Sequence, residues 1–397
     1  MVLSVPRISC DFEGGNVCAV NIERFNDQWH VHFAADPHGG TETLWFYFRV
    51  DWECRDTFKL ILTNAEICLG GRNDKGWSRV HPVVRHLSGS EPRTEDWQRC
   101  NGGTVQKLPD GRFKVSWDVQ SLTGSFEFAF CYPYTCRELE ETLNACKGYW
   151  RCDSIGVTSK GREMMRLSNS YGSEEQNCLG VYIIARQHSG ETPGSWVLDG
   201  LLRSAAENLS PDELVIWAVP FANLDGVIEG DYGKDPHPID VNRSWFSPMP
   251  MRHEVATIQA DIERFAKRCR IIATIDLHAP GAVEADGAYF QQLHPSRSAS
   301  EAAKRFVELM KGHLPKDLMS ENEYRVAQYP SRWMRGNEMG EFSRWVWERF
   351  AVVATAFETP YSRSRETVLQ IEHYKQLGSS LLEGLRSYAK KISSAPQ

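Results

Sequence analysis

The sequence lacks the features of an exported or membrane-spanning chain. Its apolar runs, of which 181–185 and 351–357 are typical, fall far short of the roughly 20 residues that cross a bilayer. Its N-terminal segment has none of the charged n-region, long apolar h-region and small-residue cleavage site that a secretory signal requires. We therefore expect a soluble protein that stays in the cytoplasm.

Basic charge is also scarce. Lys and Arg number 45 against 52 Asp and Glu, which gives a net charge of −7 at pH 7. Nucleic acids and anionic membranes bind basic surfaces, so we expect neither as a partner. The 11 cysteines form no CxxC pair, and a chain of 397 residues needs no disulfides to hold its core. We interpret them as reduced thiols.

Several catalytic motifs are missing as well. The chain contains no GxSxG nucleophile elbow and no GxxxxGKS or GxxxxGKT phosphate loop, which excludes the simplest serine-hydrolase and nucleotide-binding interpretations. His253 and Glu254 lack the second histidine of an HExxH zinc helix. His30 and His32 alternate on one face of an expected strand and could meet one metal ion, but the sequence shows no Cys or carboxylate partner for them.

The composition is that of a globular protein, with 41% hydrophobic and 24% charged residues. The length favours two domains. We expect an N-terminal domain over residues 1–135, because short aromatic or β-branched segments there alternate with turn-forming residues. This pattern predicts an antiparallel β-sandwich. The expected strands include 29–33, 44–50, 58–62, 113–117 and 126–130.

Residues 136–397 form the second expected domain, in which strand and helix patterns alternate. The expected strands are 180–186, 214–219, 271–277 and 351–357, and the expected helices are 136–146, 195–207, 255–268, 299–311 and 366–391. This alternation is typical of an α/β domain around a mostly parallel sheet.

Three of these strands run into side chains that bind metals or protons. Segment 180–186 leads to His188 and Glu191, 271–277 to His278, and 351–357 to Glu358. Ligands of open α/β sheets bind beyond the carboxyl ends of the strands, so these side chains are expected at one rim. Two imidazoles and a carboxylate form a catalytic zinc pattern that leaves the fourth position for water. A second carboxylate beside that water could take its proton. Each of these residues alone also fits a structural role.

Asn242 and Arg243 follow a loop rich in Gly and Pro between the second and third strands. A guanidinium on the same rim could offer a planar pair of donors to a substrate carboxylate. Considered alone, this arginine fits an ordinary surface ion pair better.

Five motifs resemble, in the right order, those of the zinc metallocarboxypeptidases, and within that family the cytosolic carboxypeptidase-like branch. The likeness covers nearly the whole chain. Residues 8–16 resemble the branch's opening motif, and 128–135 resemble the end of its N-terminal β-domain. Residues 185–196 resemble the first zinc motif, 276–278 the second, and 357–359 the strand end that carries the catalytic glutamate.

The resemblance implies a carboxypeptidase-type fold with a mixed, mostly parallel sheet and helices on both faces, preceded by the β-sandwich. It implies one zinc ion on His188, Glu191 and His278, with Glu358 as general base. Asn242 and Arg243 match the pair that holds the C-terminal carboxylate of the substrate. The implied activity is zinc-dependent hydrolysis of the C-terminal bond of a peptide or protein. Two alternatives keep the same ligands: a zinc amidase or deacylase acting on a small molecule, and a catalytically weak protein that only binds C-termini.

One position departs from the family pattern. The family has Asn-Pro-Asp-Gly and, ten residues after that Asn, an Arg that stabilises the oxyanion. Here Leu224 replaces the Pro, and Gly233 stands at the position of the Arg. Loss of one oxyanion donor costs about 100- to 1000-fold in rate in another enzyme. Either another cation substitutes, with neighbouring Lys234 the first candidate, or the substrate is unusual, or the enzyme is slow.

The pocket for the departing side chain is expected from two loops, 249–253 and 328–339. Arg252, Arg332 and Arg335 could favour an acidic side chain there, although solvated surface charge explains each of them as well. Tyr324 and Tyr329 are both candidates for the tyrosine with which the family covers its substrate.

Overall fold

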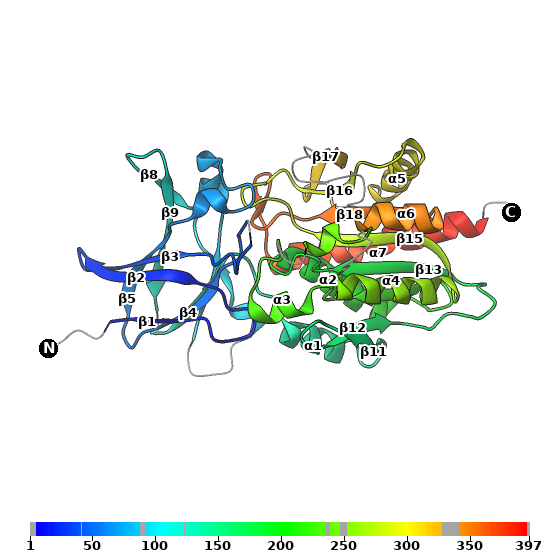
Figure 1. Cartoon of the computed structure of the whole chain (residues 1–397), viewed down its shortest axis with the longest axis horizontal. Coiled ribbons are helices and arrows are strands. Elements are labelled where there is room, and N and C mark those ends of the chain that lie inside the picture. The colour runs from blue at the N-terminus through cyan, green and yellow to red at the C-terminus, as the bar shows by residue number, and fades with distance from the viewer. Residues whose placement is uncertain are drawn as a thin grey trace.

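The computed structural model describes residues 5–40, 42–87, 93–122, 124–234, 239–246, 252–327 and 341–394. Figure 1 shows an elongated molecule with the N-terminal strands at one end and the helices and central sheet at the other. Among the helices in these ranges, none combines the length and hydropathy of a membrane-crossing segment.

Two five-stranded sheets form the N-terminal region. The first has the order β1-β4-β10-β6-β7, and all of its strand pairs are antiparallel. The second has the order β2-β3-β5-β9-β8 and is antiparallel except for the β3–β5 pair. The strands are β1 (Arg7–Ser9), β2 (Cys18–Phe25), β3 (Gln28–Ala34), β4 (Tyr47–Asp51), β5 (Asp56–Leu62), β6 (Val83–His86), β7 (Gln98–Arg99), β8 (Thr104–Lys107), β9 (Phe113–Ser121) and β10 (Phe126–Ala129).

Alternation along the strands builds the core between these sheets. On β3, Trp29, Val31 and Phe33 are buried, because successive side chains of a strand point to opposite faces. The ring of Phe33 lies 4.9 Å from that of Phe48 on β4 of the other sheet, measured between centroids. Aromatic contacts of this kind join the two inner faces, which confirms the predicted sandwich.

The C-terminal region is built on an eight-stranded sheet of order β11-β12-β14-β13-β15-β18-β16-β17. The pairs β13–β14, β13–β15, β15–β18 and β16–β17 are parallel. The strands are β11 (Arg151–Val157), β12 (Glu163–Ser168), β13 (Leu179–Ala185), β14 (Val215–Val219), β15 (Arg270–His278), β16 (Ala288–Leu293), β17 (Met319–Ala327) and β18 (Val353–Glu358). The helices are α1 (Cys136–Ala145), α2 (Thr192–Asn208), α3 (Leu224–Glu229), α4 (His253–Ala266), α5 (Arg297–Met310), α6 (Phe342–Phe350) and α7 (Ile371–Ser394).

Helices cover both faces of this sheet, as predicted. Val181 and Ile183 of β13 belong to the apolar cluster that includes α2, α5 and α7. Tyr182 and Ile184, which point to the other face, belong to the cluster formed with α4 and α6. A strand buried on both faces explains why 181–185 is one continuous apolar run.

The predicted start of the last helix is wrong. The last helix begins at Ile371 rather than at 366, because the preceding residues form the small hairpin of β19 (Arg363–Ser364) and β20 (Thr367–Val368). Extended backbone in this hairpin cannot continue a helix.

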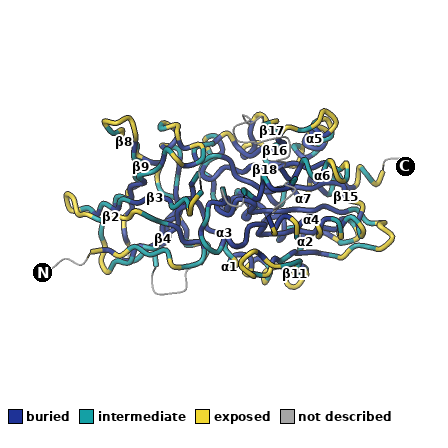
Figure 2. Tube along the Cα trace, in the orientation of Figure 1, coloured by how far each residue is buried: buried dark blue, intermediate teal, exposed yellow. Residues whose placement is uncertain are grey.

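The two regions are joined by buried contacts, and the buried trace runs from the sandwich into the central sheet (Figure 2). Arg99 of β7 donates hydrogen bonds to the carbonyl oxygens of Leu369 and Tyr361 and to the hydroxyl of Tyr374. Its guanidinium also lies 4.4 Å from the ring centroid of Tyr132. These contacts hold the sandwich against the segment that follows β18.

Candidate metal centre

The strand ends bring the predicted ligands to one rim of the sheet. β13, β15 and β18 are parallel neighbours, with Ala185 opposite Leu277 and His278 directly opposite Glu358. His188 follows the end of β13, and Glu191 is the residue immediately before α2. The structure thus gathers His188, Glu191, His278 and Glu358, which the sequence spreads over 171 positions.

The first three side chains face one another at close range. The Nδ1 atoms of His188 and His278 each lie 2.7 Å from a different oxygen of Glu191. One donor atom from each residue lies within 4.8 Å of the others. All three residues are about 2% exposed, so water is largely excluded from the donor atoms.

The outward-facing nitrogens of both imidazoles also have carboxylate partners. The Nε2 atom of His278 lies 2.7 Å from Asp276, and that of His188 lies 3.1 Å from Asp240. A carboxylate on the second nitrogen fixes the orientation and tautomer of a metal-binding imidazole. Neither aspartate was predicted as part of the site. Asp276 stands two residues before His278 on one strand, a spacing that places both on one face. Asp240 lies in a loop and gave no such signal.

The charges in this cluster support one another. Burial alone would raise the pKa of Glu191, but the two imidazoles hold that pKa below its ordinary value. Burial would likewise lower the pKa of His278, yet Asp276 and Glu191 raise it well above the ordinary value. The pKa of Asp240 is lowered because His188 and Lys234 outweigh its burial. The lowered pKa values favour the ionised forms of Glu191 and Asp240, which lie on either side of His188.

A buried arginine shapes the loop that carries His188. Arg186 adopts a left-handed backbone conformation with φ of 63°. Its Nε donates to the carbonyl oxygen of Ser189 at 2.7 Å, and its Nη1 donates to the carbonyl oxygen of Tyr134 and to the hydroxyl of Ser195. The end of the sandwich region is thereby tied to the turn between His188 and α2.

The donor set fits zinc. Two imidazole nitrogens and one carboxylate are the ligands of a common class of catalytic zinc sites, which keep a fourth position for water. The Nδ1 atoms of both histidines face Glu191, and the Nε2 atoms are already engaged by aspartates. His188, Glu191 and His278 would therefore hold the ion through the two Nδ1 atoms and the glutamate.

Glu358 lies opposite His278 on the adjacent strand and has fewer hydrogen-bond partners than the three donors. Its Oε1 accepts a hydrogen bond of 3.1 Å from Gln291, and its buried Oε2 has no partner among the described residues. Burial raises the pKa of Glu358 to about 7. A buried carboxylate oxygen without a partner is costly, and a carboxyl whose pKa lies near neutrality can exchange protons readily.

Asn242 also reaches the centre. It lies on a short 3-10 helix, Val241–Arg243, in which the Asp240 side chain accepts from the backbone N–H of Asn242 at 2.8 Å. The Oδ1 atom of Asn242 accepts from Gln187, and its Nδ2 lies 3.4 Å from His278 Nε2. Arg243 follows directly and donates from Nη1 to the Asn242 carbonyl oxygen at 3.2 Å.

Position 233 cannot hold a side chain. Gly233 has a φ of +96°, and a Cβ there would lie 2.4 Å from the backbone nitrogen of Ser189 and 2.8 Å from Cα of His188. The loop that carries the ligand thus excludes the expected Arg. Lys234 reaches the centre instead: its Nζ lies 3.0 Å from His188 Nε2 and 4.0 Å from Asp240.

The structure describes only some of the residues predicted to line the side-chain pocket or to cover the substrate. Residues 247–251 and 328–340 lie outside the described residues, and they include Tyr329, Arg332 and Arg335. Tyr324 donates from its hydroxyl to Gln292 at 2.7 Å. Arg252 is buried and donates from Nε to Glu254 at 3.1 Å.

Two family profiles match the chain. The profile of the cytosolic carboxypeptidase N-terminal domain matches residues 8–130, and that of the zinc carboxypeptidases matches residues 135–267. The second match contains His188, Glu191, Asn242 and Arg243 and ends before His278 and Glu358. The chain belongs to the zinc carboxypeptidase family. Membership of this family implies that the metal is zinc. Within the family it belongs to the cytosolic carboxypeptidase-like branch, because the N-terminal domain of that branch precedes the zinc carboxypeptidase domain.

Individual relatives agree with this placement. Cytosolic carboxypeptidase 6 of Homo sapiens is 30% identical over 267 residues, which are 61% of this chain and 50% of the relative. Cytosolic carboxypeptidase 3 of Bos taurus is 27% identical over 318 residues, which are 70% of this chain and 30% of the relative. The chain thus spans half or less of the length of these two relatives. The metallo-carboxypeptidase of Burkholderia cenocepacia shares the fold, with a TM-score of 0.75, 19% identity and coverage of 98% of this chain and 100% of that one.

Proposed function

We propose that this protein is a zinc-dependent metallocarboxypeptidase that hydrolyses the C-terminal peptide bond of a peptide or protein in the cytoplasm. The observation that carries the proposal is the buried set of His188, Glu191 and His278, with Glu358 opposite His278 on the adjacent strand end. We further propose that residues 1–135 and 136–397 are its two domains.

The substrate is held by its terminal carboxylate. Arg243 provides a guanidinium that can bind both oxygens of a carboxylate, and Asn242 provides an amide donor beside it. Asn242 lies next to His278, so a carboxylate bound there would leave the last peptide bond close to the metal ligands. This positioning would account for cleavage at the C-terminus alone.

Glu358 moves the proton. The zinc ion that the ligands fit, when bound, polarises the scissile carbonyl and makes water more acidic. The buried Oε2 of Glu358, which has no partner in the described part of the chain, would accept the proton of the attacking water. The same carboxyl would then return the proton to the departing amine, because its pKa near 7 suits both transfers.

Lys234 is the candidate for the missing positive charge. Its amino group is mostly buried, with 14% of the side chain exposed, and lies beside His188 and Asp240. In this conformation it contacts the Nε2 side of His188 rather than the Nδ1 side. It would therefore have to change rotamer to reach a developing oxyanion.

A library of peptides with varied last residues tests the proposal, with each peptide supplied as free acid and as amide. We expect release of the last residue from the free acids only, with zinc required. Glu358→Gln should abolish release while zinc content is unchanged, and the matched variant of the exposed Glu372, Glu372→Gln, should behave as wild type.

Other outcomes would overturn the proposal. Cleavage of acyl-amino acids alone would identify an amidase or deacylase. Binding of the free acids by a wild-type protein as inert as Glu358→Gln would identify a protein that only recognises C-termini.

A further inference from the structure

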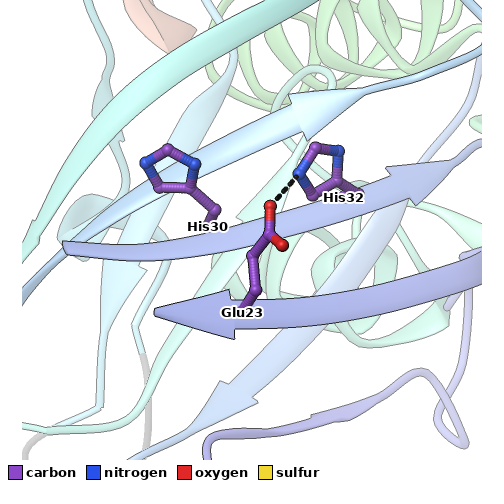
Figure 3. Close-up of side chains that lie close together, drawn as sticks. All are labelled: Glu23, His30 and His32. Carbon is purple, nitrogen blue, oxygen red and sulfur yellow. Dashed lines mark hydrogen bonds and ion pairs between the residues drawn. The ribbon is translucent and has the colours of Figure 1, made fainter. Parts of the chain in front are cut away.

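One other group of three metal-ligating side chains occurs within the described residues, far from the central sheet. Glu23, His30 and His32 lie on the sandwich sheet, with one donor atom from each within 4.8 Å of the others. Figure 3 shows both imidazoles on the same side of β3 and the Glu23 carboxylate reaching toward them from the neighbouring strand β2. The sequence offered the two histidines, and the structure supplies the carboxylate.

Strand register explains this arrangement. His30 and His32 are two residues apart on β3, so both point away from the core, into which Val31 points. Glu23 is paired directly with His30 on the antiparallel strand β2. Its Oε1 lies 3.2 Å from Nε2 of His32, so it can contact either imidazole.

We propose that Glu23, His30 and His32 form a second metal site, which binds a divalent transition-metal ion such as zinc on the outer face of the sandwich. Imidazole and carboxylate ligands suit such ions. Donors around one tetrahedral zinc lie about 3.4 Å apart, because each bond is about 2.0–2.1 Å long. The ring centroids of the two histidines are 6.5 Å apart, so closing the site needs only side-chain rotation.

The surroundings permit that rotation. The side chains of Glu23 and His32 are 56% and 20% exposed, so they can turn without repacking a core, and water can fill the remaining ligand position. Lys59 on β5 is paired with His30 and would oppose a cation. Its Nζ, however, lies 3.5 Å from Asp118 on β9, which offsets its charge.

An ion at this position would fasten an edge strand. β2 lies at the edge of its sheet, and its one partner among the described strands is β3, through a ladder interrupted between Cys18 and Asn21. A ligand from β2 and two from β3 would join the strands in addition to their hydrogen bonds. The site is independent of the proposed peptidase activity.

Zinc stoichiometry of the full chain, by equilibrium dialysis and metal analysis, tests the proposal. We expect two ions in the wild type and one in His30→Ala/His32→Ala, with peptidase activity unchanged. Glu23→Gln should lower the affinity for the second ion by at least about tenfold, because losing a direct ligand lowers affinity at least as much as losing an outer hydrogen-bond partner. His313→Ala removes another exposed histidine and should still bind two ions.

Electron paramagnetic resonance of bound Cu²⁺ distinguishes specific loss of the second site from misfolding of a variant. In His188→Ala/His278→Ala, Cu²⁺ should show electron paramagnetic resonance with coupling to two nitrogens, and adding His30→Ala/His32→Ala should remove it. A single ion in the wild type at saturating zinc, or a second ion retained by His30→Ala/His32→Ala, would overturn the proposal.

Discussion

Within the described residues, the same set of donors, two imidazoles and one carboxylate, occurs twice, once exposed and once buried. His188, Glu191 and His278 are about 2% exposed, and an aspartate holds the second nitrogen of each imidazole. In the sandwich group, the Glu23 side chain is 56% exposed, and its carboxylate contacts His32. The same donor types therefore occur in two environments that differ in burial and in the partners of the imidazoles.

We expect burial and the outer carboxylates to give the two groups different functions. A buried ion acts in a low local dielectric, where its charge acts strongly on a substrate. An ion on the open sheet face is surrounded by water and by side chains that rotate. We therefore expect chemistry at the buried group and, at most, strand fastening at the exposed one.

The largest effect is expected from removing a buried ligand. His278→Ala leaves Glu191 and Asp276 as buried carboxylates without their shared imidazole partner. Breaking a buried charge pair costs about 3–5 kcal/mol, so we expect lost peptidase activity and lower stability in urea titrations. Equal loss of stability in His313→Ala would contradict the role of burial.

A smaller loss is expected from the outer carboxylates. Asp276→Asn keeps the shape of the side chain but removes the charge that orients His278. Zinc affinity and activity should fall about 10- to 100-fold, as measured by competition with a chelating dye. Asp118→Asn, on the sandwich, is the matched control and should leave peptidase activity unchanged. Unaltered zinc affinity in Asp276→Asn would show that His278 binds zinc equally well without the charge of Asp276.

The buried base should give the activity an acidic limb. Burial raises the pKa of Glu358 to about 7, and only its ionised form can accept a proton. kcat/KM should therefore fall about tenfold per pH unit below that pKa. A nearby zinc ion lowers the pKa of a carboxylate, so the limb of the zinc-loaded enzyme should lie between about pH 5 and pH 7. A rate that does not change between pH 5 and 7 would argue against Glu358 as the base.

The smallest effect is expected from the exposed group in the absence of metal. Glu23→Gln changes a solvated carboxylate, so the free energy of unfolding should shift by less than about 0.5 kcal/mol. Addition of zinc should then raise the melting temperature of the wild type more than that of Glu23→Gln. Equal zinc-induced shifts in melting temperature for the wild type and Glu23→Gln would show that this carboxylate does not bind the metal.

Continuous apolar runs made much of the C-terminal fold predictable from the sequence. The segments 180–186, 271–277 and 351–357 match β13, β15 and β18 to within two residues, because strands buried on both faces form continuous apolar runs. The ligands follow those strand ends, so their gathering at one rim could also be anticipated.

Other features carried no such signal. β2 was not predicted, because only Cys18 and Ile22 among its residues are even partly buried, and Glu23 was therefore missed as a partner of the two histidines. α6 was missed as well. The absence of an Arg at position 233 was visible in the sequence, but its cause, the contact of Gly233 with the backbone of His188 and Ser189, required coordinates.

Crystals grown with zinc and measured at its absorption edge would test the central claim most directly. The account predicts an anomalous peak bonded to Nδ1 of His188, Nδ1 of His278 and the Glu191 carboxylate, with bonds of about 2.0–2.2 Å. Asp240 and Asp276 should remain on the Nε2 atoms. A fully occupied zinc ion bound elsewhere with no peak at these three residues, or a peak bonded through the Nε2 atoms, would contradict it.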